Sequence, residues 1–473
     1  MENMKGFLTH PIFRTVSEIA AEEGTKAYAI GGYVRDLLLY RPSEDIDIVV
    51  LDNVIEVAKK CAGRLNCHKV SIFKHFGTAM FKSHGVEIEF VGARKESYSK
   101  DSRNPHVEHG TLEDDQKRRD FTINIMAISL NRENYGELIT PFNGLQDLEA
   151  RIIRTPLDPD ITFSDDPLRM FRAIRFASQL NFHIEDRTFE AIRRNCSRIS
   201  ILSMERMIDE FNKIMSSPEP SRGIYMLDDS GILELFFPEL YHLKGIEKKG
   251  GIAHKDIFNH TLQVLDSVAL KSDNIWLRWA ALLHDIGKPA TKRFSSEQGW
   301  TFYGHNIVGE RMVPKIFKRL KLPLNDKMKF VAKMVSLHMR PIVLSEDEVT
   351  DSAIRRLLFE AGDDIEELMQ LAEADITSKQ EARVKKYIEN YRIVRQKLKD
   401  VEEKDNIRNF QPPINGEEIM KIFNIPPCDT IGTIKSAIKE AILDGKVSNN
   451  REDVYRYMLE IAHGLGLQEV EPL

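Results

Sequence analysis

The sequence changes character at residues 155–159, a short stretch that reads Thr-Pro-Leu-Asp-Pro. Before this stretch, short β-rich runs alternate with helical patterns and turn residues, and the clearest runs are residues 27–30, 46–51, 78–81 and 86–91. After it, apolar residues follow the helical repeat almost to the end of the chain, as in residues 167–180, 188–195, 204–215, 259–270 and 276–286. The pattern predicts an α/β or α+β first part and a mostly α-helical remainder.

The length of 473 residues exceeds what a single hydrophobic core usually holds and predicts about three domains. Two stretches have the composition of linkers: residues 244–251 are rich in Gly and Lys, and residues 400–415 are charged and contain Pro. Cutting at these linkers and near residue 155 gives four predicted pieces, residues 1–155, 156–243, 244–400 and 401–473.

Composition excludes several classes of protein. Hydrophobic residues make up 42% of the chain and charged residues 30%, which excludes extended disorder. The apolar runs are too short to cross a bilayer, and residues 1–13 do not read as a secretion signal. The four cysteines form no Cys-x-x-Cys pair, so we expect neither a disulfide framework nor a thiolate zinc site, and a cytoplasmic protein. The net charge of −6 argues against coating nucleic acid by bulk charge, although a local patch can bind it.

A pair of glycines, Gly31 and Gly32, separates the strand-like run 27–30 from an apolar helical segment that begins with Tyr-Val-Arg35-Asp36. Where a glycine pair joins a strand to the start of a helix, free backbone N–H groups can approach an anion closely. Phosphate is the anion that we expect to bind there. Glycine pairs are also common in ordinary turns, so this feature alone is more often structural than functional.

Asp45 and Asp47 lie inside an otherwise apolar run shortly after the glycines. Residues i and i+2 of a strand share a face, so the two carboxylates would lie side by side and repel each other unless a divalent ion separates them. Mg²⁺ prefers oxygen ligands and keeps phosphate oxygens as partners, which points to phosphoryl or nucleotidyl transfer. The strand 86–91 offers Glu87 and Glu89 as a third carboxylate; we favour Glu89, and the solvated face of an edge strand is the alternative for Glu87.

Later segments complete a series of motifs that resembles the nucleotidyltransferase superfamily of bacterial-type tRNA CCA-adding enzymes and poly(A) polymerases. In order, the segments are the glycine turn with the Asp pair, Arg118-Arg119-Asp120-Phe121-Thr122-x-Asn124, Gly144-x-x-Asp147-Leu148, Asp165-Asp166-x-x-Arg169 and Ser203-Met204-Glu205-Arg206. Asp165 stands where the family usually has Glu, and Thr140 stands where an acid commonly precedes the Pro-Phe-x-Gly turn.

The resemblance implies a role for each of these residues. Asp45 and Asp47 would hold Mg²⁺, and Glu89 would help to activate the terminal hydroxyl of the RNA. The nucleotide-binding residues that it implies are Gly31, Gly32, Arg35, Asp36, Arg119, Asp120, Asn124, Asp166, Arg169, Arg172 and Arg175. Without the resemblance, the arginines of the segment 169–175 would be interpreted as an ordinary exposed helix face.

Asp166 and Arg169 are assigned to base recognition by the resemblance, and side-chain chemistry agrees. Cytosine and adenine both present an amino donor beside a ring-nitrogen acceptor, whereas uracil and guanine present a carbonyl beside an N–H. An Asp acceptor next to an Arg donor complements the first pair and repels the second. Each buried group left unpaired costs about 1–3 kcal/mol, so protein side chains would replace a nucleic-acid template.

A second constellation begins with His284-Asp285, which follows the apolar segment 279–283. The dipeptide alone is weak evidence. Together with His260 and Asp375 on other predicted helices, it resembles the metal ligands of HD-domain phosphohydrolases, and His305 and His338 fall where further histidines of such sites occur. Imidazole and carboxylate ligands suit a divalent transition metal, and the resemblance leaves open whether the site hydrolyses phosphoesters or only serves tRNA docking.

The resemblances together imply an α+β fold: a nucleotidyltransferase head with a mixed or antiparallel sheet (1–155), then an extended all-α body. The body would comprise a helical neck for base recognition and RNA binding (156–243), an HD domain (244–400) and a helical tail (401–473). The implied activity is addition of C, C and A to the tRNA 3′ end from CTP and ATP with release of pyrophosphate. The oligomeric state stays open.

Three alternatives remain for the activity: a poly(A) polymerase, an enzyme that adds only CC or only A, and an HD phosphohydrolase whose head binds RNA without catalysis. Residues 379–399 carry eight Lys or Arg residues against two Glu, with Tyr387 and Tyr391 one turn apart. This segment is either an RNA contact with aromatic stacking or a plain exposed helix.

Overall fold

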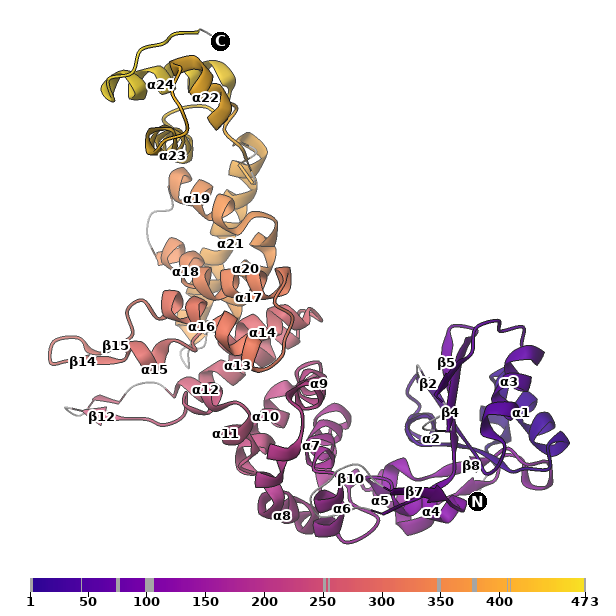
Figure 1. Ribbon diagram of the computed structural model, residues 1–473. Coiled ribbons are helices and arrows are strands. Elements are labelled where there is room, and N and C mark those ends of the chain that lie inside the picture. Colours follow the sequence, from indigo (N-terminus) through magenta and orange to yellow (C-terminus); the bar gives the residue numbers. More distant parts are fainter. Residues whose placement is uncertain are drawn as a thin grey trace. The chain divides into compact units, whose positions relative to one another are not determined.

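The computed structural model describes residues 3–43, 45–73, 77–97, 106–249, 252–253, 256–346, 350–376, 381–405, 407–408 and 410–471. The chain forms two compact units, Met1–Pro238 and Glu239–Leu473 (Figure 1). The first unit contains a mixed sheet and helices, and the second is almost entirely helical, which confirms the predicted α+β fold. The finer division into four pieces stays a prediction, and one helix, α21 (Glu381–Asp405), runs through residue 400.

The sheet of the first unit has seven strands in the order β3-β4-β5-β2-β1-β8-β9. Their bounds are β3 (Ser71–Phe73), β4 (Thr78–Ser83), β5 (Val86–Gly92), β2 (Asp45–Val50), β1 (Ala27–Ile30), β8 (Ala127–Ser129) and β9 (Leu138–Ile139). Strands β2 and β5 pair in parallel, and every other pair in the sheet is antiparallel. All four strands expected from the sequence are present.

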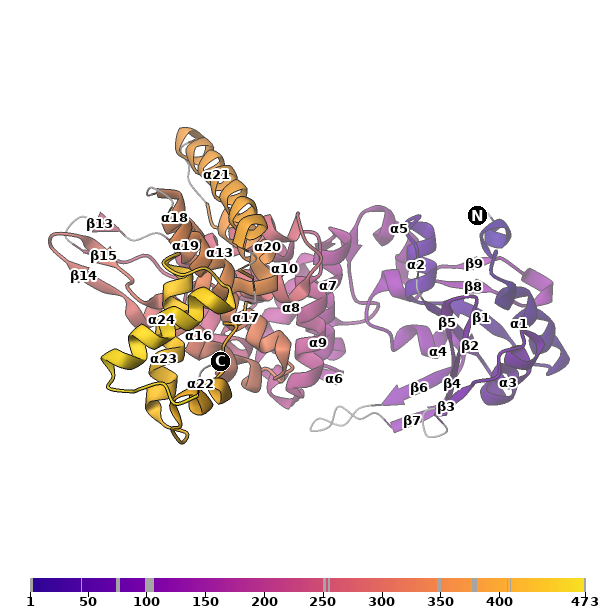
Figure 2. The same ribbon diagram turned by 90° about the horizontal axis from the view of Figure 1, so that it is seen from above.

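Helices α1 (Pro11–Glu22) and α3 (Val54–Arg64) cover one face of this sheet (Figure 2). The α1 helix buries an apolar stripe at i, i+3, i+4 spacing that includes Ile12 and Val16. On β2, Ile46 and Ile48 are fully or almost fully buried, so the alternation of a strand directs Asp45 and Asp47 to the opposite face. Strand β1, which pairs with β2, leads through Gly31 into α2 (Gly32–Leu38).

The neck of the first unit, residues 156–238, is a set of short helices. They are α6 (Pro159–Asp165), α7 (Leu168–Leu180), α8 (Asp186–Asn195), α9 (Met204–Met215), α10 (Pro220–Asp229) and α11 (Ile232–Phe236). The Asp166 carboxylate accepts a hydrogen bond from Leu168 N–H at the start of α7, and Asn181, with φ 56°, ends that helix. Phe171 and Phe211 both pack against Phe236, with ring centroids 5.2 and 5.3 Å apart, and this aromatic core fixes α7 against α9 and α11.

The second unit is a helical stack. Its longer helices are α13 (Ile257–Ala269), α14 (Ile275–Leu283), α16 (His305–Arg319), α17 (Asp326–Leu337), α18 (Met339–Glu346), α19 (Asp351–Ala361), α20 (Ile365–Ala374), α21, α22 (Gly416–Phe423), α23 (Asp429–Leu443) and α24 (Arg451–Gly464). Trp279 on α14 is fully buried and packs edge-on against Phe317 of α16. The other α-helices of the two units are short: α4 (Leu112–Lys117), α5 (Gly144–Glu149), α12 (Pro238–Tyr241) and α15 (Lys288–Thr291). The other strands form two-stranded ribbons: β6 (Arg94–Ser97) with β7 (His106–His109), β10 (Ile152–Ile153) with β11 (His183–Ile184), β12 (Lys248–Lys249) with β13 (Ile252–Ala253), and β14 (Arg293–Ser295) with β15 (Gly299–Thr301).

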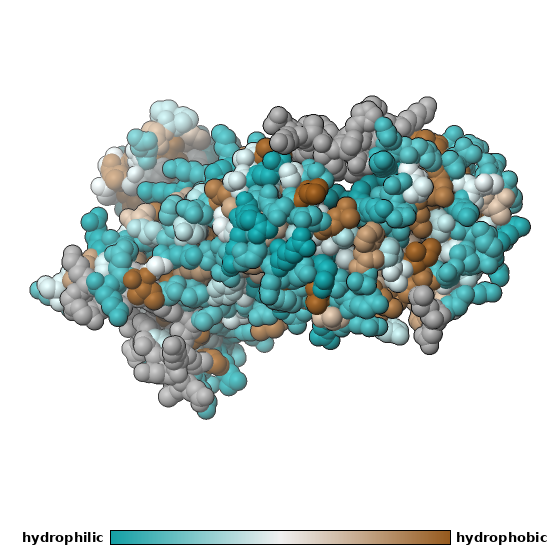
Figure 3. Space-filling model, turned by 90° about the horizontal axis from the view of Figure 1, so that it is seen from below, coloured by the Kyte–Doolittle hydropathy of each residue, from teal (hydrophilic) through white to brown (hydrophobic). Residues whose placement is uncertain are grey.

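Polar side chains cover most of the face shown in Figure 3, and hydrophobic ones are scattered among them. Among the described residues, no helix combines the length and the apolar composition that a bilayer crossing needs. The exposed large hydrophobic residues include Tyr40, Leu270 and Tyr303, which lie far apart in the sequence.

Gly223 on α10 lies in close contact with two other helices of the neck. A Cβ at this position would overlap Ile214 Cγ2 on α9 and lie 3.2 Å from Ser178 Oγ on α7. We expect Gly223→Ala to lower the free energy of unfolding of the first unit by about 1–3 kcal/mol, because the helices must separate to admit the methyl group. Urea titration followed by hydrogen–deuterium exchange in α7 and α10 would measure this change.

Gly63 provides the matched control, since it lies in α3 of the same unit and a Cβ there would meet nothing within 4 Å. Gly63→Ala is expected to leave the free energy of unfolding unchanged or to raise it by up to about 1 kcal/mol. Equal effects of the two substitutions would contradict the packing argument.

Candidate functional site

Three carboxylates meet on the open face of the sheet. Asp45 and Asp47 lie on β2, and the parallel pairing with β5 places Glu89 directly beside Asp47. Burial, with the negative charges of Asp45 and Glu89, raises the pKa of Asp47 to about 6 against the opposing charge of Arg119. Burial also raises the pKa of Glu89, with Glu87 and Asp45 adding to the effect. The structure thus brings together the three carboxylates expected from the sequence.

This arrangement is chemically suited to a divalent cation. Asp45 is exposed and Asp47 and Glu89 are partly buried, so oxygen ligands line a surface that substrate can reach. Mutual repulsion adds to the effect of burial on the two pKa values, and it is relieved when a cation lies between the carboxylates. Hard oxygen donors are the ligands that Mg²⁺ prefers. These side chains therefore fit Mg²⁺.

Gly31 lies at the turn after β1, close to the Asp47 carboxylate. Ile30 pairs with Asp47 in the sheet, and the chain then turns through Gly31 with φ 80°. A Cβ on Gly31 would lie 2.9 Å from Asp47 Oδ2 and 3.3 Å from Arg119 Nη1. Both the backbone conformation and the close approach require glycine here. The same distances place the Arg119 guanidinium beside the Asp47 carboxylate.

Arg119 is held by a residue to which the sequence analysis gave no role. Asp115 on α4 is fully buried and accepts hydrogen bonds from Arg119 Nε at 2.9 Å and Arg118 Nε at 3.0 Å. Burial opposes ionisation of Asp115, but the two guanidinium groups lower its pKa below the usual range. The signal was present in the sequence, because Asp115 lies three and four positions before the two arginines on a helix.

A buried hydrogen-bonded chain links the glycine turn to the neck. Arg35 donates to both oxygens of Asp36, at 2.9 and 2.8 Å, and to Asn124 Oδ1 at 2.9 Å. Asn124 donates to Asp120 Oδ1 at 3.1 Å, and Arg172 on α7 donates to Asp120 Oδ2 at 2.7 and 2.6 Å. Burial alone would raise the pKa of Asp120, but Arg172 and Asn124 lower it to about 2. Five of the predicted nucleotide-binding residues therefore form one network.

Three guanidinium groups lie around the aromatic ring of Phe176. The guanidinium carbons of Arg35, Arg172 and Arg175 lie 5.0, 5.3 and 4.2 Å from its centroid. Arg175 is buried and pairs with buried Glu210 at 3.0 Å, and burial lowers its pKa to about 10. The alternative of an ordinary exposed arginine face on α7 is therefore wrong.

Asp166 and Arg169 occupy the junction of α6 and α7. Asp166 Oδ1 accepts from Leu168 N–H at 3.1 Å, and Oδ2 lies 3.7 Å from Arg206 on α9. Arg169 donates to the carbonyl oxygen of Arg118 at 2.6 Å. The contact ties Arg169 to the main chain next to Arg119, and Arg206 is a partner that the sequence analysis did not foresee.

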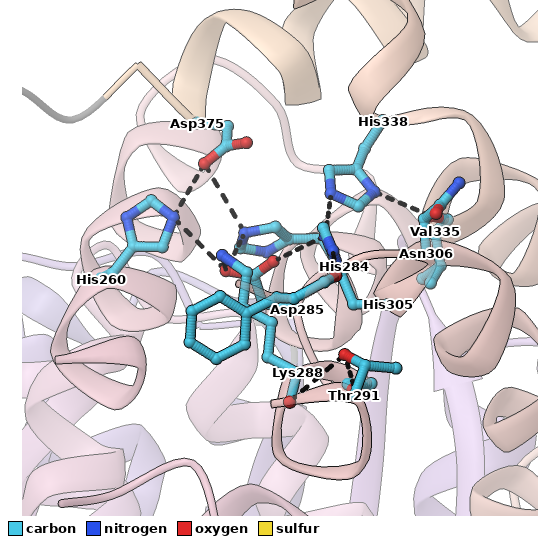
Figure 4. Close-up of polar contacts among 12 residues, drawn as sticks. His260, His284, Asp285, Lys288, Thr291, His305, Asn306, Val335, His338 and Asp375 are labelled. Atoms are coloured by element: carbon cyan, nitrogen blue, oxygen red, sulfur yellow. Dashed lines mark hydrogen bonds and ion pairs between the residues drawn. The ribbon is translucent and has the colours of Figure 1, made fainter. Parts of the chain in front are cut away.

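The second constellation also assembles, in the other unit (Figure 4). His260 lies on α13, His284 and Asp285 follow α14, and Asp375 follows α20. His260 Nε2 lies 2.8 Å from Asp375 Oδ1 and 3.6 Å from Asp285 Oδ2, and His284 Nε2 lies 3.3 Å from Asp285 Oδ2. Burial lowers the pKa of His260, which favours the neutral imidazole that a metal requires.

One buried atom tests whether this cluster fits a metal. His284 Nδ1 lies 2.7 Å from the carbonyl oxygen of Ala281, so the ring donates there, and in its neutral form it presents the lone pair of Nε2 to the cluster. His284 Nε2 is among the buried side-chain atoms, within the described residues, that have no hydrogen-bond partner. A divalent transition metal is the natural partner for such a nitrogen surrounded by carboxylates.

The basic segment 379–399 is only partly described, because residues 377–380 and the side chains of 381–384 lie outside the described part. Tyr391 is 1% exposed, with its hydroxyl 3.4 Å from the carbonyl oxygen of Ala372. Arg395 pairs with Glu373 at 2.7 Å and with Glu366 at 2.5 Å. Base stacking on Tyr391 is therefore wrong, because this residue packs in the core of its own unit.

The sheet, the three carboxylates and the linked arginines define a nucleotidyltransferase, and comparisons with known proteins specify the family. The family models that match are Poly A polymerase head domain (residues 27–154), Probable RNA and SrmB- binding site of polymerase A (181–243) and HD domain (257–380). An A-adding tRNA nucleotidyltransferase of Deinococcus radiodurans is 33% identical over 72% of this chain and 77% of that protein. A CCA-adding enzyme of Geobacillus sp. is 30% identical over 93% of this chain and 94% of that protein.

Among solved structures, a tRNA nucleotidyltransferase complexed with a primer tRNA and an incoming ATP analog superposes with a TM-score of 0.57. It is 26% identical and matches 80% of this chain and 99% of that chain. The chain belongs to the family of tRNA nucleotidyltransferases.

Gly31→Ala tests the close approach at the carboxylates. The added methyl group must displace the Asp47 carboxylate, and a shift of about 1 Å in a catalytic group lowers a rate about a hundredfold. We expect that loss in the rate of nucleotide addition to an RNA 3′ end, with the fold retained by circular dichroism.

Gly85→Ala is the matched control, because Gly85 has φ 84° and a Cβ added there would meet no atom within 4 Å. It places a Cβ at a similar positive φ, without the crowding. Loss of activity in both variants would show that backbone strain, rather than displacement of Asp47, is responsible.

Proposed function

We propose that this protein adds C, C and A to the 3′ end of tRNA, using CTP and ATP with Mg²⁺ and releasing pyrophosphate. One observation carries the proposal: the three carboxylates on β2 and β5 lie beside the Gly31 turn, and a buried network joins that turn to the helix that follows Asp166. The network thereby connects the residues proposed to transfer the nucleotide with the residues proposed to select its base.

In the proposed reaction, the 3′-hydroxyl oxygen of the RNA attacks the α-phosphorus of the nucleotide. A P–O bond forms to the RNA, and the bond to pyrophosphate breaks. Asp45 and Asp47 would hold Mg²⁺, which neutralises charge on the triphosphate. Glu89 lies beside Asp47, and its raised pKa suits a group that takes up the proton of the attacking hydroxyl. Arg119, oriented by Asp115, would bind the triphosphate.

Base selection is assigned to Asp166 and Arg169. The backbone N–H of Leu168 fixes one carboxylate oxygen, and the other lies 3.7 Å from Arg206, beyond hydrogen-bond distance. That second oxygen can accept from the exocyclic amino group of cytosine or adenine. Arg169, held by the carbonyl oxygen of Arg118, would donate to the ring nitrogen. The arrangement would discriminate against uracil and guanine, which present the opposite pattern.

At the second site, we propose that His260, His284, Asp285 and Asp375 hold a divalent transition metal. His260, His284 and Asp285 are buried, the Asp375 side chain is 12% exposed, and each ligand atom lies within 3.7 Å of another. Such a metal activates water toward a phosphoester, so a phosphohydrolase side activity is proposed with it. A cytoplasmic location is proposed as well, since all four cysteines are free thiols.

A second candidate activity is addition of the terminal A alone. The Deinococcus radiodurans relative, 33% identical, is an A-adding enzyme, whereas the Geobacillus relative is a CCA-adding enzyme. The catalytic residues do not separate these two activities, nor a poly(A) polymerase, because all three use the same chemistry. The intact carboxylate site argues against a head that only binds RNA.

One experiment separates these activities. The full-length protein is incubated with tRNA that lacks its last three nucleotides, or only its last one, together with CTP, ATP or both, and the RNA ends are sequenced. We expect growth by CCA that then stops. Extension only of tRNA that already ends in CC would assign A addition, and continued addition of A would assign poly(A) polymerase.

Asp45→Asn serves as the inactive variant, with an expected loss of about a thousandfold or more because several kcal/mol of charge stabilisation by Mg²⁺ is removed. Asp52→Asn is its matched control: Asp52 lies just beyond the other end of β2 and is exposed. Full activity of the Asp45→Asn variant would refute the proposed transferase site.

Asp166→Asn tests base selection. Asn keeps an oxygen to accept from Leu168 N–H, and it presents an NH₂ donor where Asp166 Oδ2 was an acceptor. We expect the preference for CTP over UTP to fall by about ten- to a hundredfold, since each mismatched polar group costs about 1–3 kcal/mol. Competition between labelled CTP and UTP on the same tRNA measures the ratio.

Asp160→Asn, which alters a carboxylate on the same α6 helix that pairs with Arg194, provides the control and should leave the ratio unchanged. An Asp166→Asn variant that still rejects UTP as well as the parent protein does would remove Asp166 from base recognition.

A further inference from the structure

Tyr40 is an exposed aromatic residue in a backbone conformation that favours glycine. It follows α2 with φ 54° and is 86% exposed. Its N–H donates to the carbonyl oxygen of Leu37, and the N–H of Arg41 donates to that of Asp36, so Tyr40 occupies the left-handed position that often ends a helix. A Cβ is strained there, and the ring gains little burial in return. Strain of this kind clusters at positions that serve a function.

Phe7 lies beside Tyr40 and extends the exposed aromatic surface. The two ring centroids are 6.5 Å apart with an interplanar angle of 67°, and Phe7 is 41% exposed. The short helix Met4–Phe7 is held in place, because Met4 is buried and its N–H donates to the carbonyl oxygen of Gly136 at 2.8 Å. The edge-to-face contact with Phe7 therefore orients the Tyr40 ring while most of that ring stays exposed.

The loop after Tyr40 leads directly to the carboxylate site. Four residues separate Tyr40 from Asp45, so their Cα atoms lie within about 18 Å of each other. Arg41 Nη1 donates to the carbonyl oxygen of Gln179 on α7 at 3.4 Å, and Ser43 Oγ donates to the carbonyl oxygen of Asp45 at 2.9 Å. These bonds anchor the loop near both of its ends. Tyr40 is therefore held at a limited distance from the first carboxylate of the site.

The surroundings of the Tyr40 ring suit a nucleic acid. Arg41 follows it directly and is exposed, and Lys5, two residues before Phe7, is exposed as well. Single-stranded RNA commonly binds to such surfaces, because a ring stacks on a base while cations approach the phosphates. Two partly exposed rings offer too little area for a stable protein interface, which buries about 800 Å² on each partner. The patch therefore favours an RNA partner.

We propose that Tyr40 stacks on a base close to the 3′ end of the RNA and so holds that end at the carboxylate site. Phe7 supports the ring, and Arg41 lies where it can approach the neighbouring phosphate. Every base has a π-face, so this contact positions the RNA without selecting its sequence. The inference rests on the proposed function, since it takes the RNA 3′-hydroxyl as the group that reacts beside Asp45.

Binding of tRNA that lacks its last three nucleotides tests this inference. Fluorescence anisotropy of the labelled tRNA gives its Kd for the full-length protein without added nucleotide. Tyr40→Gly should raise the Kd by about five- to a hundredfold, the loss expected for one stacked base. Tyr40→Phe keeps the ring and should bind within about twofold of the parent protein.

Steady-state kinetics locate the effect on the RNA. In Tyr40→Gly the KM for tRNA should rise as the Kd does, whereas kcat and the KM for CTP should not change. The reason is that stacking binds the RNA equally in the ground state and in the transition state.

Unfolding measurements separate RNA binding from a structural role. Tyr40→Gly relieves the left-handed strain, so the midpoint of unfolding in urea should stay the same or rise. Asn66→Gly is the matched control, because Asn66 follows α3 with φ 56° and the same pattern of backbone hydrogen bonds. It is exposed and should leave the Kd for tRNA unchanged.

Abasic tRNAs locate the stacked base. An abasic nucleotide is placed singly at each of the last four positions of the same tRNA. At one position it should weaken binding to the parent protein as much as Tyr40→Gly does. The same RNA should bind Tyr40→Gly with no further loss, because both changes remove one contact.

An unchanged Kd in folded Tyr40→Gly would overturn the proposal, as would equal losses in Tyr40→Gly and Tyr40→Phe. Dimerisation of the parent protein that Tyr40→Gly abolishes, with no change in the Kd, would assign the ring to a protein interface and overturn it too. None of these results would touch the proposed nucleotide addition, which stands or falls with extension of tRNA by the parent protein.

Discussion

The buried carboxylate of Asp120 is the constraint on which the transferase site depends. It accepts from Asn124, which in turn holds Arg35 of the glycine turn, and from Arg172 of the neck helix α7. Removing one partner from such a buried pair typically costs about 3–5 kcal/mol, because the other charge is left unpaired. The network therefore couples the geometry of the sheet edge to that of the helix that follows Asp166. A nucleotide bound between the sheet edge and this helix would contact groups on both, and the network fixes the positions of these groups relative to one another.

The carboxylate site follows from strand register. The alternation of β2 puts Asp45 and Asp47 on one face, and the parallel pairing with β5 adds Glu89 to it. A shift of one residue in that pairing would turn Glu89 to the other face and bring no carboxylate in its place, since Ile88 and Phe90 flank it. Burial raises the pKa values of Asp47 and Glu89, and the resulting crowding of negative charge, which a cation relieves, adds to the effect.

The histidine cluster, whose side chains could hold a metal ion, is assembled in a different way. His260 lies in the first turn of α13, whereas α14, α16 and α17 each bring one histidine at or next to an end, where a backbone carbonyl oxygen lies within reach of Nδ1 for His284, His305 and His338. Each of these three rings therefore presents Nε2 to the centre, as ligating histidines do when a second group fixes the tautomer. Helix ends far apart in the sequence thus converge on Asp285, the residue that contacts both halves of the cluster.

The sequence by itself determined the α+β division, the strands that carry the acids and most of the residues that cluster, because these depend on local periodicity and on motifs with fixed spacing. Only the tertiary structure decided which partners those residues have. Glu210 against Arg175 and Arg206 near Asp166 are contacts between elements whose packing no local pattern encodes. Asp115 beside Arg119 differs, because its spacing of four residues is a local signal. Burial could not be predicted from the sequence either. Tyr391 is an aromatic residue in a basic segment, as a base-stacking residue would be, yet helix packing places it in a core. Spacing along a chain fixes which side chains share a face, whereas the distance between faces depends on how whole elements pack.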